Sequence, residues 1–540
     1  MSSTNFDQFS QLVKSEDPRS SHEKLVWELA HILFDDYDDD ISSDVPKEQG
    51  MDLLHRMRKE RLSNFWRRLV QESSGMAASS ATTAEERAIA HLSANNVEDA
   101  CSDLLHGKDF RLATLVAQIG GDKTMREDMG NQINEWRRLN VLSEFTEPIR
   151  ALYELLAGNA CVCEGKKGPL EDRARTFVMS ERFGLDWRRA FGLRLWYAID
   201  PDDGLEDAVH KFVQDMESGN EQKKPLPWFS EQGLDALWVD EHAAERTDLF
   251  WGLLKLFADC AAHSPVNFAD IVMPENVSRN PTDTRLSFQL YHALSSSIRT
   301  REPTTEQEAS DLGRADQLAW GFITQLEAAG EWLWALFAAL HLSSTSQRQQ
   351  TLQSLLAHHA DQIGQASSVP FMTLRDDFHI PEAWIWEAKA LYARSAEQDP
   401  VREVQYLLKA KNWTEAHRTL CRSVAPRAVV ERDYTTLSSL LDGFEQRELV
   451  EDWSLGGQVF LDFVALVRGE GGGGGAGGLS RLLAALPAMV SERAGKIEFV
   501  ETVAVREMSG VVGRMVLEGE QNVSFSTMSP GRGESGVWGS

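Results

Sequence analysis

The stretch QLEAAGEWLWALFAALHL, residues 325–342, decides the fold class, because ten of the eleven residues from Trp332 to Leu342 are apolar. A helix that is apolar all round has no side that faces water, so it has to lie inside a stack of other helices. A membrane span needs about 20 mostly apolar residues, and four polar residues interrupt this stretch of eighteen. We therefore expect a buried helix, with Leu333 and Phe337 inside the protein.

The rest of the sequence reads as helix after helix. Apolar residues recur at steps of three and four from Leu25 to Leu466, which is the period of an amphipathic helix. We expect Ser20 and Glu23 to form a capping box and Asn96 to cap the helix that follows it. No comparable run of alternating strand residues occurs, and the helices have no fixed repeat length. The sequence therefore predicts an all-α fold, an irregular helical solenoid with at most a minor hairpin.

The charge limits the possible partners. The sequence has 83 acidic and 55 basic residues, a net charge of −28. Binding to nucleic-acid phosphates requires clustered Lys and Arg, so we expect no direct nucleic-acid partner. The same charge favours a soluble protein. Five cysteines without a framework spacing suit a reducing compartment.

Three patterns that suggest chemistry have simpler explanations. The glycine run at 469–478 matches the dinucleotide-binding pattern only because any long glycine run does. Cys161 and Cys163 lack the two-residue gap of zinc sites, and no histidine is close in sequence. His358 and His359 lack the glutamate of a zinc-protease helix. The sequence therefore predicts no catalytic residue, no cofactor and no metal ligand, and the chain is not expected to be an enzyme.

A series of phrases carries a family resemblance. The quoted stretch is followed by IPEAWIWEAKALYAR (380–394), NWTEAHRTLCRSVAPRAVV (412–430) and ERDYTTLSSLLDGF (431–444), and it is preceded by phrases that include LVWELAHILFD (25–35) and VEDACSDLLHGKDFRLATLVAQIGGD (97–122). In order and spacing they closely resemble the scaffold nucleoporins of the nucleoporin-ninety-six type, which bind the Sec-thirteen propeller in the Y-shaped coat of the nuclear pore. The fungal counterpart is the C-terminal product of a self-cleaving precursor. The resemblance runs from about residue 20 to about residue 465.

The resemblance implies a solenoid that folds back on itself as a trunk, a crown and a tail. The expected divisions are N-terminal trunk helices at 1–72, crown helices at 73–200, returning trunk helices at 201–345, tail helices at 346–468, a glycine-rich linker at 469–478, C-terminal helices at 479–519 and a disordered tail at 520–540. Within this plan, the polar composition of residues 72–84 predicts a loop.

The resemblance also implies a function and partners. A member of this family of ancestral coatomer elements is a structural subunit of the nuclear pore complex at the nuclear envelope, where it supports transport of protein and mRNA by holding other nucleoporins in fixed geometry. The implied partners are a Sec-thirteen type β-propeller, a second helical nucleoporin bound through the crown, and Y-complex hub subunits bound through the tail, with no membrane span. Family members carry a β-rich insertion ahead of the trunk that completes the propeller. This sequence starts at helix-like residues, so an incomplete propeller contact is expected, and residues 479–540 match the family poorly.

The alternative is a vesicle-coat-type helical adaptor that binds a β-propeller partner at endoplasmic-reticulum exit sites. Such coat subunits carry their own N-terminal propeller and a proline-rich linker. The sequence has 17 prolines and no proline-rich run, which favours the nuclear pore.

Phe110, Met125, Met129 and Trp136 are the candidate residues of a partner interface. They belong to a segment, 97–142, that holds more apolar side chains than one helical pair can bury. Methionines on a helix face make adaptable contacts, so a charge at Met129 is expected to abolish binding of the crown partner while leaving the chain folded. The other interpretation is that all these side chains pack within the chain.

Overall fold

The computed structural model describes residues 5–35, 47–169, 171–200, 202–262, 264, 268–298, 306–469, 475–492 and 499–526. Helices dominate this part of the chain, and its only strands are β1 (Val162–Cys163) and β2 (Phe177–Val178), which pair antiparallel. The all-α prediction with a minor hairpin is confirmed. The chain divides into two compact units, residues 1–325 and 326–540.

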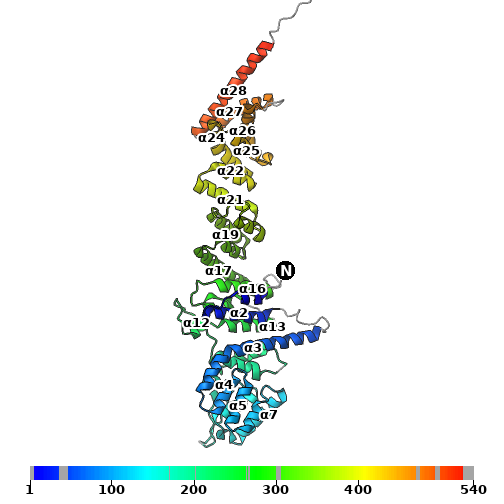
Figure 1. The fold of residues 1–540 in the computed structure, drawn as a ribbon, viewed down its shortest axis with the longest axis vertical. Helices are drawn as coiled ribbons and strands as arrows, with labels where there is room; N and C mark the ends of the chain where they lie inside the picture. The colour runs from blue at the N-terminus through cyan, green and yellow to red at the C-terminus, as the bar shows by residue number, and fades with distance from the viewer. Residues whose placement is uncertain are drawn as a thin grey trace, which may run out of the picture. The chain divides into compact units, whose positions relative to one another are not determined.

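Figure 1 draws the helices of the first unit, which run to α16 and include most of α17. Their bounds are α1 (Phe6–Leu12), α2 (Pro18–Phe34), α3 (Lys47–Ser80), α4 (Ala84–Leu92), α5 (Val97–His106), α6 (Phe110–Val116), α7 (Lys123–Arg138), α8 (Glu147–Leu156), α9 (Met179–Arg182), α10 (Trp187–Leu193), α11 (Leu205–Glu217), α12 (Trp228–Glu231), α13 (Leu249–Ala261), α14 (Phe268–Ile271), α15 (Pro274–Val277), α16 (Arg285–Ile298) and α17 (Glu306–Ala329). Short turns of 3-10 or π type add η2 (Val141–Glu144), η3 (Arg194–Ala198) and η4 (Ala243–Glu245).

The second unit continues with helices of similar length. Their bounds are α18 (Trp332–Ala339), α19 (Thr345–His358), α20 (Val369–Met372), α21 (Glu382–Tyr392), α22 (Pro400–Lys409), α23 (Trp413–Thr419), α24 (Ala425–Glu431), α25 (Tyr434–Asp442), α26 (Gly457–Arg468), α27 (Gly475–Glu492) and α28 (Phe499–Ser526). Short turns add η5 (Thr373–Asp377), η6 (Ala393–Glu397), η7 (Leu420–Val424), η8 (Arg447–Leu449) and η9 (Trp453–Leu455).

Helices that are distant in sequence meet in one fold-back core of the first unit. There α2 packs against α13 and α16, and α3 packs against α10. Trp66 of α3 is fully buried, and its ring meets Trp187 at 5.8 Å and Phe191 at 5.0 Å edge-on. Its indole N–H donates to the carbonyl of Arg188 at 2.8 Å, across 122 residues of sequence. These contacts bring the returning chain back onto its N-terminal helices.

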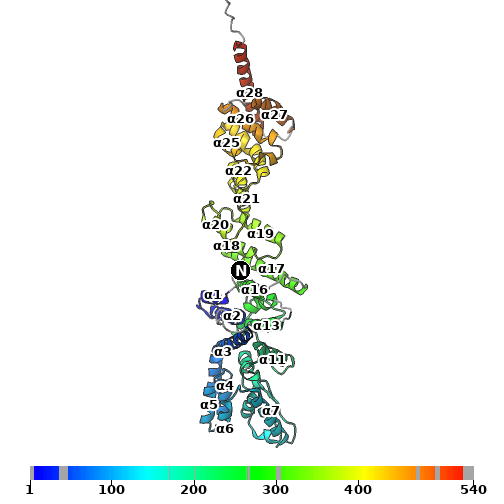
Figure 2. The same ribbon diagram turned by 90° about the vertical axis from the view of Figure 1, so that its right-hand side faces the viewer.

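A second cluster of buried side chains forms the core of a lobe between residues 84 and 200, which we call the 84–200 lobe. Its helices α4, α5 and α6 follow one another in a stack, as Figure 2 shows and the contacts between consecutive helices confirm. The hairpin of β1 and β2 belongs to this lobe. The solenoid prediction is thus confirmed, whereas the boundaries assigned to trunk, crown and tail stay predictions.

Five turns between helices in the described residues share one backbone device. In each, a residue with positive φ precedes an Asn or Asp that caps the next helix: Asn95 before Asn96, Lys108 before Asp109, Gln398 before Asp399, Lys411 before Asn412, and Arg432 before Asp433. The N–H of the capping residue usually donates to a carbonyl five residues earlier, as from Asn96 to His91 at 3.0 Å. The end of one helix and the cap of the next therefore occupy two adjacent residues. The predicted Asn96 cap is confirmed.

The predicted capping box at the start of α2 is wrong in its residues. Asp17 is the N-cap, Ser20 completes the box and Pro18 occupies the first turn. Glu23 instead lies buried, and its carboxylate accepts a hydrogen bond from Arg285 of α16 at 2.8 Å. A residue that the local pattern assigned to a cap therefore pairs across the fold-back core.

The loop predicted at residues 72–84 is largely helical, because α3 continues to Ser80. Ser74 is buried on this helix and its hydroxyl donates to the carbonyl of Ala90 in α4 at 2.7 Å. Alanine favours helix, and packing against α4 outweighs the serines of this segment. The chain leaves the helix only before Thr83, which caps α4.

Helix α18, the helix of the quoted stretch, is not buried all round. Leu336 is fully buried, but Leu333 and Phe337 are only half buried and Trp334 is 55% exposed. One face packs against α19, and Phe337 reaches Phe378 at a ring distance of 5.8 Å. The apolar composition therefore overstated the burial of this helix.

The C-terminal predictions fall partly on residues that are not described. Residues 470–474 of the predicted linker and 527–540 of the predicted disordered tail lie outside the described residues. The glycines from Gly475 onward begin α27, and α28 extends to Ser526. Among the helices of the described residues, none combines the length and apolar character that a membrane crossing needs.

Trp66→Ala is expected to destabilise the first unit by about 3–5 kcal/mol, because it leaves a cavity in the fold-back core. The exposed Trp320 of α17 supplies the control, and Trp320→Ala is expected to cost less than about 1 kcal/mol. Hydrogen exchange of α3 and α10, followed by mass spectrometry, measures both. Equal exchange in the two variants would contradict the assignment of Trp66 to the core.

In α18, Leu336→Ala is expected to cost about 2–5 kcal/mol, because its fully buried side chain leaves a cavity. Phe337→Ala is expected to cost less, because water already reaches part of its ring, and Trp334→Ala is expected to be nearly neutral. Chemical unfolding of the three variants gives the ranking. A larger loss for Phe337→Ala than for Leu336→Ala would show that the helix is oriented differently.

Candidate partner interface

Helix α7 lies on the surface of the 84–200 lobe and carries two of the predicted interface residues. Only Ile133 of this helix is fully buried. Met125 and Met129 are half buried and pack against the core of the lobe. Asp122 starts the helix by accepting the N–H of Met125 at 3.0 Å. The outer part of both methionines therefore remains open to a partner.

Trp136, the third predicted residue, is held by contacts within the chain. Its ring lies edge-on to Phe145 at 5.1 Å and to Tyr153 at 4.8 Å. Edge-to-face pairs of this kind stabilise beyond the area they bury. Trp136 thus anchors α7 to α8, and only its half-exposed edge is left for another protein.

Phe110 is set apart from the other three candidates because it is 65% exposed. It is the first residue of α6, directly after the Asp109 cap. Leu105, 48% exposed, lies on the other side of the same turn at the end of α5. We call Leu105 and Phe110 the 105/110 edge. Leu105 was not among the predicted interface residues, because its helical spacing matched the buried face of α5. Contact of any of these residues with a partner stays a prediction.

A buried arginine of the 84–200 lobe, Arg150 of α8, holds the hairpin of β1 and β2 in place. Arg150 donates to the carbonyl of Arg175 at 2.8 Å and to that of Glu164 at 2.9 Å, which fixes the hairpin.

Cys161 and Cys163 are buried and free. Burial raises the pKa of Cys161 to about 12 and raises that of Cys163 as well. Both thiols therefore stay protonated at neutral pH, and a thiol is a poor metal ligand or nucleophile in that form.

A pocket of about 480 Å³ lies beside the start of α2, lined by residues that include Pro18, His22, Trp228 and Leu237. His22 stacks on Trp228 with ring centroids 5.0 Å apart. Burial and, to a lesser extent, the nearby charge of Arg188 together lower the pKa of His22 to about 3. The side chain is therefore neutral at physiological pH.

Arg188 ties the wall of this pocket to the fold-back core. Its guanidinium contacts Glu231 at 2.6 Å and the fully buried Asp248 at 3.0 Å. Burial raises the pKa of Glu231 to about 7, against the opposing effect of Arg188. This ion cluster positions the segment around α12, in which the four-residue α12 and the three-residue η4 are the only helical turns between α11 and α13.

Of the sequence motifs considered for cofactor or metal binding, the histidine pair alone belongs to a possible metal site in the described residues. The glycine run follows α26, a helix, where dinucleotide binding needs a strand. Among the described residues, one group of His, Cys, Asp or Glu side chains brings three ligand atoms together, and it consists of Glu327, His358 and His359. The two histidines were not predicted as ligands because they lack the glutamate of a zinc-protease helix, whereas Glu327 lies on another helix, α17.

Comparison with known proteins gives the family. The model of the family described as Nup96, nuclear protein 96, matches residues 86–392, more than half of the chain. The chain belongs to the nuclear protein 96 family. The matched residues begin in α4 and end with α21, so the family pattern includes the 84–200 lobe from residue 86 onward and the helices from α11 to α21. The family resemblance predicted from the sequence is confirmed.

Relatives in fungi and an amoeba agree with this assignment. The chain is 35% identical over 491 residues to nucleoporin NUP145 of Chaetomium thermophilum, covering 90% of the chain and 23% of the relative. It is 30% identical over 463 residues to nucleoporin nup189 of Schizosaccharomyces pombe, covering 84% of the chain and 24% of the relative. Nuclear pore complex protein Nup98-Nup96 of Dictyostelium discoideum is 28% identical over 387 residues, 70% of the chain and 17% of the relative. The chain thus spans a quarter or less of these proteins.

His22 is expected to make the first unit lose stability on acidification. Its folded pKa of about 3 lies below the ordinary value of 6.5, so between these values the unfolded chain binds a proton that the folded chain does not. The free energy of unfolding therefore falls as the pH drops below 6.5. Glu231, with its raised pKa, acts in the opposite direction over about the same range, so the effect has to be isolated by substitution.

His22→Phe keeps the stack on Trp228 and removes the proton site. Between pH 7 and pH 5 the wild type is expected to lose on the order of 1 kcal/mol more stability than this variant. His242→Phe, at an exposed histidine, is the control and should follow the wild type. Urea unfolding at each pH measures the difference. Parallel curves for wild type and His22→Phe would contradict the burial of His22.

Proposed function

We propose that the chain is a structural scaffold subunit of the Y-shaped coat of the nuclear pore complex at the nuclear envelope. One observation carries the proposal, namely the continuous family match over residues 86–392. The printed names of the relatives, nucleoporin and nuclear pore complex protein, support it. In that role the chain supports transport of protein and mRNA by holding other nucleoporins in fixed geometry.

The construction of the fold-back core suits a role that depends on shape. The fully buried Arg194 contacts Asp215 at 2.8 Å and Glu221 at 3.2 Å, and Glu221 also accepts a hydrogen bond from Ser180 of α9. Breaking such a buried network by removing one partner is strongly destabilising. We infer that the chain works by presenting rigid surfaces, and that it is not an enzyme.

We propose that the second helical nucleoporin binds the 84–200 lobe at the 105/110 edge and the outer face of Met125 and Met129. An interface gains most of its energy from a few apolar or aromatic anchors at its centre, and Phe110 is the exposed aromatic residue of this surface. The Y-complex hub subunits are assigned to the tail helices of residues 346–468, and the Sec-thirteen type propeller to the N-terminal trunk.

Localisation tests the proposed function. The natural gene product, tagged with a fluorescent protein at its C-terminus, is expected to label the nuclear rim as discrete pores. Labelling of endoplasmic-reticulum exit sites in place of the rim would instead indicate the vesicle-coat adaptor and would overturn the proposal.

Phe110→Glu is expected to weaken binding of the helical nucleoporin at least about tenfold, because a charge replaces an exposed apolar anchor. The folding stability of the Phe110→Glu variant should be nearly unchanged. Met129→Glu should weaken both binding and folding, since Met129 is half buried. Phe499→Glu is the matched control, because Phe499 is also exposed and also begins a helix. Isothermal titration calorimetry measures the affinities. Unchanged affinity for Phe110→Glu would place the interface elsewhere.

A further inference from the structure

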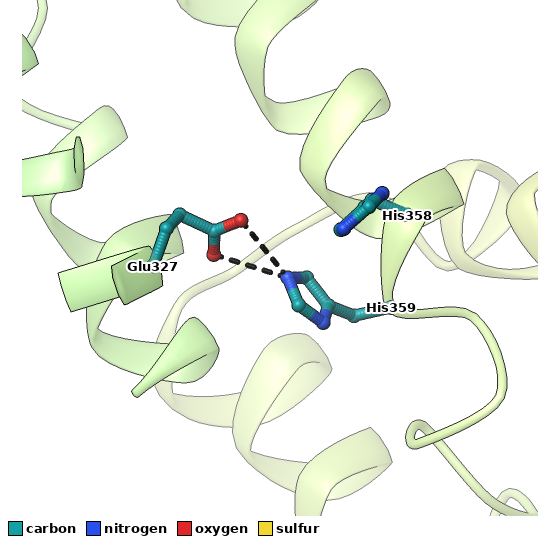
Figure 3. A group of neighbouring side chains, drawn as sticks. All are labelled: Glu327, His358 and His359. Atoms are coloured by element: carbon teal, nitrogen blue, oxygen red, sulfur yellow. Dashed lines mark hydrogen bonds and ion pairs between the residues drawn. The ribbon is translucent and has the colours of Figure 1, made fainter. Parts of the chain in front are cut away.

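Glu327, His358 and His359 bring three ligand atoms within 4.8 Å of one another in the second unit. Glu327 lies in the last turn of α17, His358 is the last residue of α19, and His359 is the residue that ends that helix. Figure 3 shows the carboxylate and the two imidazoles turned toward a common space. No motif in the sequence connects these positions, because 31 residues separate the glutamate from the first histidine.

The end of α19 explains how two neighbouring histidines can face the same point. Successive side chains on a helix point about 100° apart, which would separate the rings. His359 has left the helix, with φ −106° and ψ 22°. Its ring meets that of His358 edge-on, with centroids 4.8 Å apart. The turn therefore brings both imidazoles to one side.

His359 and Glu327 are already held in position. The Nε2 atom of His359 lies 3.0 and 3.1 Å from the two carboxylate oxygens of Glu327. On the other side of the ring, Nδ1 lies 3.3 Å from the side-chain amide of Gln362. The ring also stacks on Trp332, with centroids 5.4 Å apart. His358 is exposed, so its ring can rotate toward the pair.

We propose that Glu327, His358 and His359 bind a divalent transition-metal ion, with Zn²⁺ the best match. Two imidazoles and one carboxylate are a known ligand set for this ion, which binds them at about 2.0–2.2 Å. Ligand atoms around a tetrahedral ion of that size stand about 3.3 Å apart, close to the present separation of Nε2 and the carboxylate. A small movement of His358 completes three ligands, and water takes the fourth position.

Binding moves one proton within the site. Nε2 of His359 donates its lone pair to the metal, so the proton of the neutral ring resides on Nδ1. The side-chain amide of Gln362 can turn so that its oxygen accepts a hydrogen bond from this Nδ1–H, which fixes the ring as such partners do in metal sites. The ion then links the end of α17 to the end of α19 as a clasp.

Metal titration of the full chain tests the proposal. After treatment with EDTA and dialysis, the chain is expected to take up one Zn²⁺ per molecule in isothermal titration calorimetry. His358→Ala and Glu327→Gln are each expected to weaken that binding at least about tenfold, because each removes a ligand. His106→Ala is the matched control, since His106 is exposed and also ends a helix, and it should bind as the wild type does.

Co²⁺ gives a second readout, because its visible absorption reports a tetrahedral site with nitrogen and oxygen ligands. The band is expected in the wild type and in His106→Ala, and is expected to be lost in His358→Ala. Absence of stoichiometric Zn²⁺ uptake would overturn the proposal, and so would equal affinity in the wild type, His358→Ala and Glu327→Gln. Circular dichroism of each variant confirms folding, and either result leaves the proposed scaffold function untouched, because no partner is involved.

Discussion

The packing of Trp66 against α10 is the contact on which the first unit depends. A solenoid whose helices touch only their sequence neighbours has no need to reverse its direction. Here an aromatic ring from α3 enters a site built by Trp187 and Phe191, more than 120 residues away, and its N–H pairs with the carbonyl of Arg188. That single site fixes both the return of the chain and the position of the 84–200 lobe that emerges from it.

Apolar packing is not directional, so it does not by itself specify which segments meet. The ion pairs buried around this contact do, because each charge needs a particular partner. Arg188 and Arg194 lie on or just beyond α10, and each pairs with two carboxylates from irregular or returning segments. Such clusters are costly to desolvate, so they contribute little net stability when complete. Their value is in specificity, because a displaced segment would leave a guanidinium buried without its partners. This agrees with a protein whose function is to keep a shape.

The helices and several of their caps were predictable from the sequence, because both depend on residues that are close together in the chain. The Asn and Asp caps after residues of positive φ, as at Asn96, occur where the apolar period restarts. What failed depended on contacts distant in sequence. Leu333 and Phe337 were expected inside, yet both are only half buried, and Trp334 of the same helix is 55% exposed. Glu23 was assigned to a cap, yet it pairs with Arg285. Of the interface candidates, the structure leaves Phe110 exposed and places Trp136 in an internal aromatic cluster, a distinction that depends on Phe145 and Tyr153.

Purification of the natural protein from nuclear envelopes, with quantitative mass spectrometry of everything that remains bound, tests the central claim most directly. The scaffold account predicts that other nucleoporins copurify in fixed ratios to this chain, among them a β-propeller of the Sec-thirteen type and a second helical protein. Recovery of the chain with vesicle-coat subunits, or with no partner in constant ratio, would contradict it.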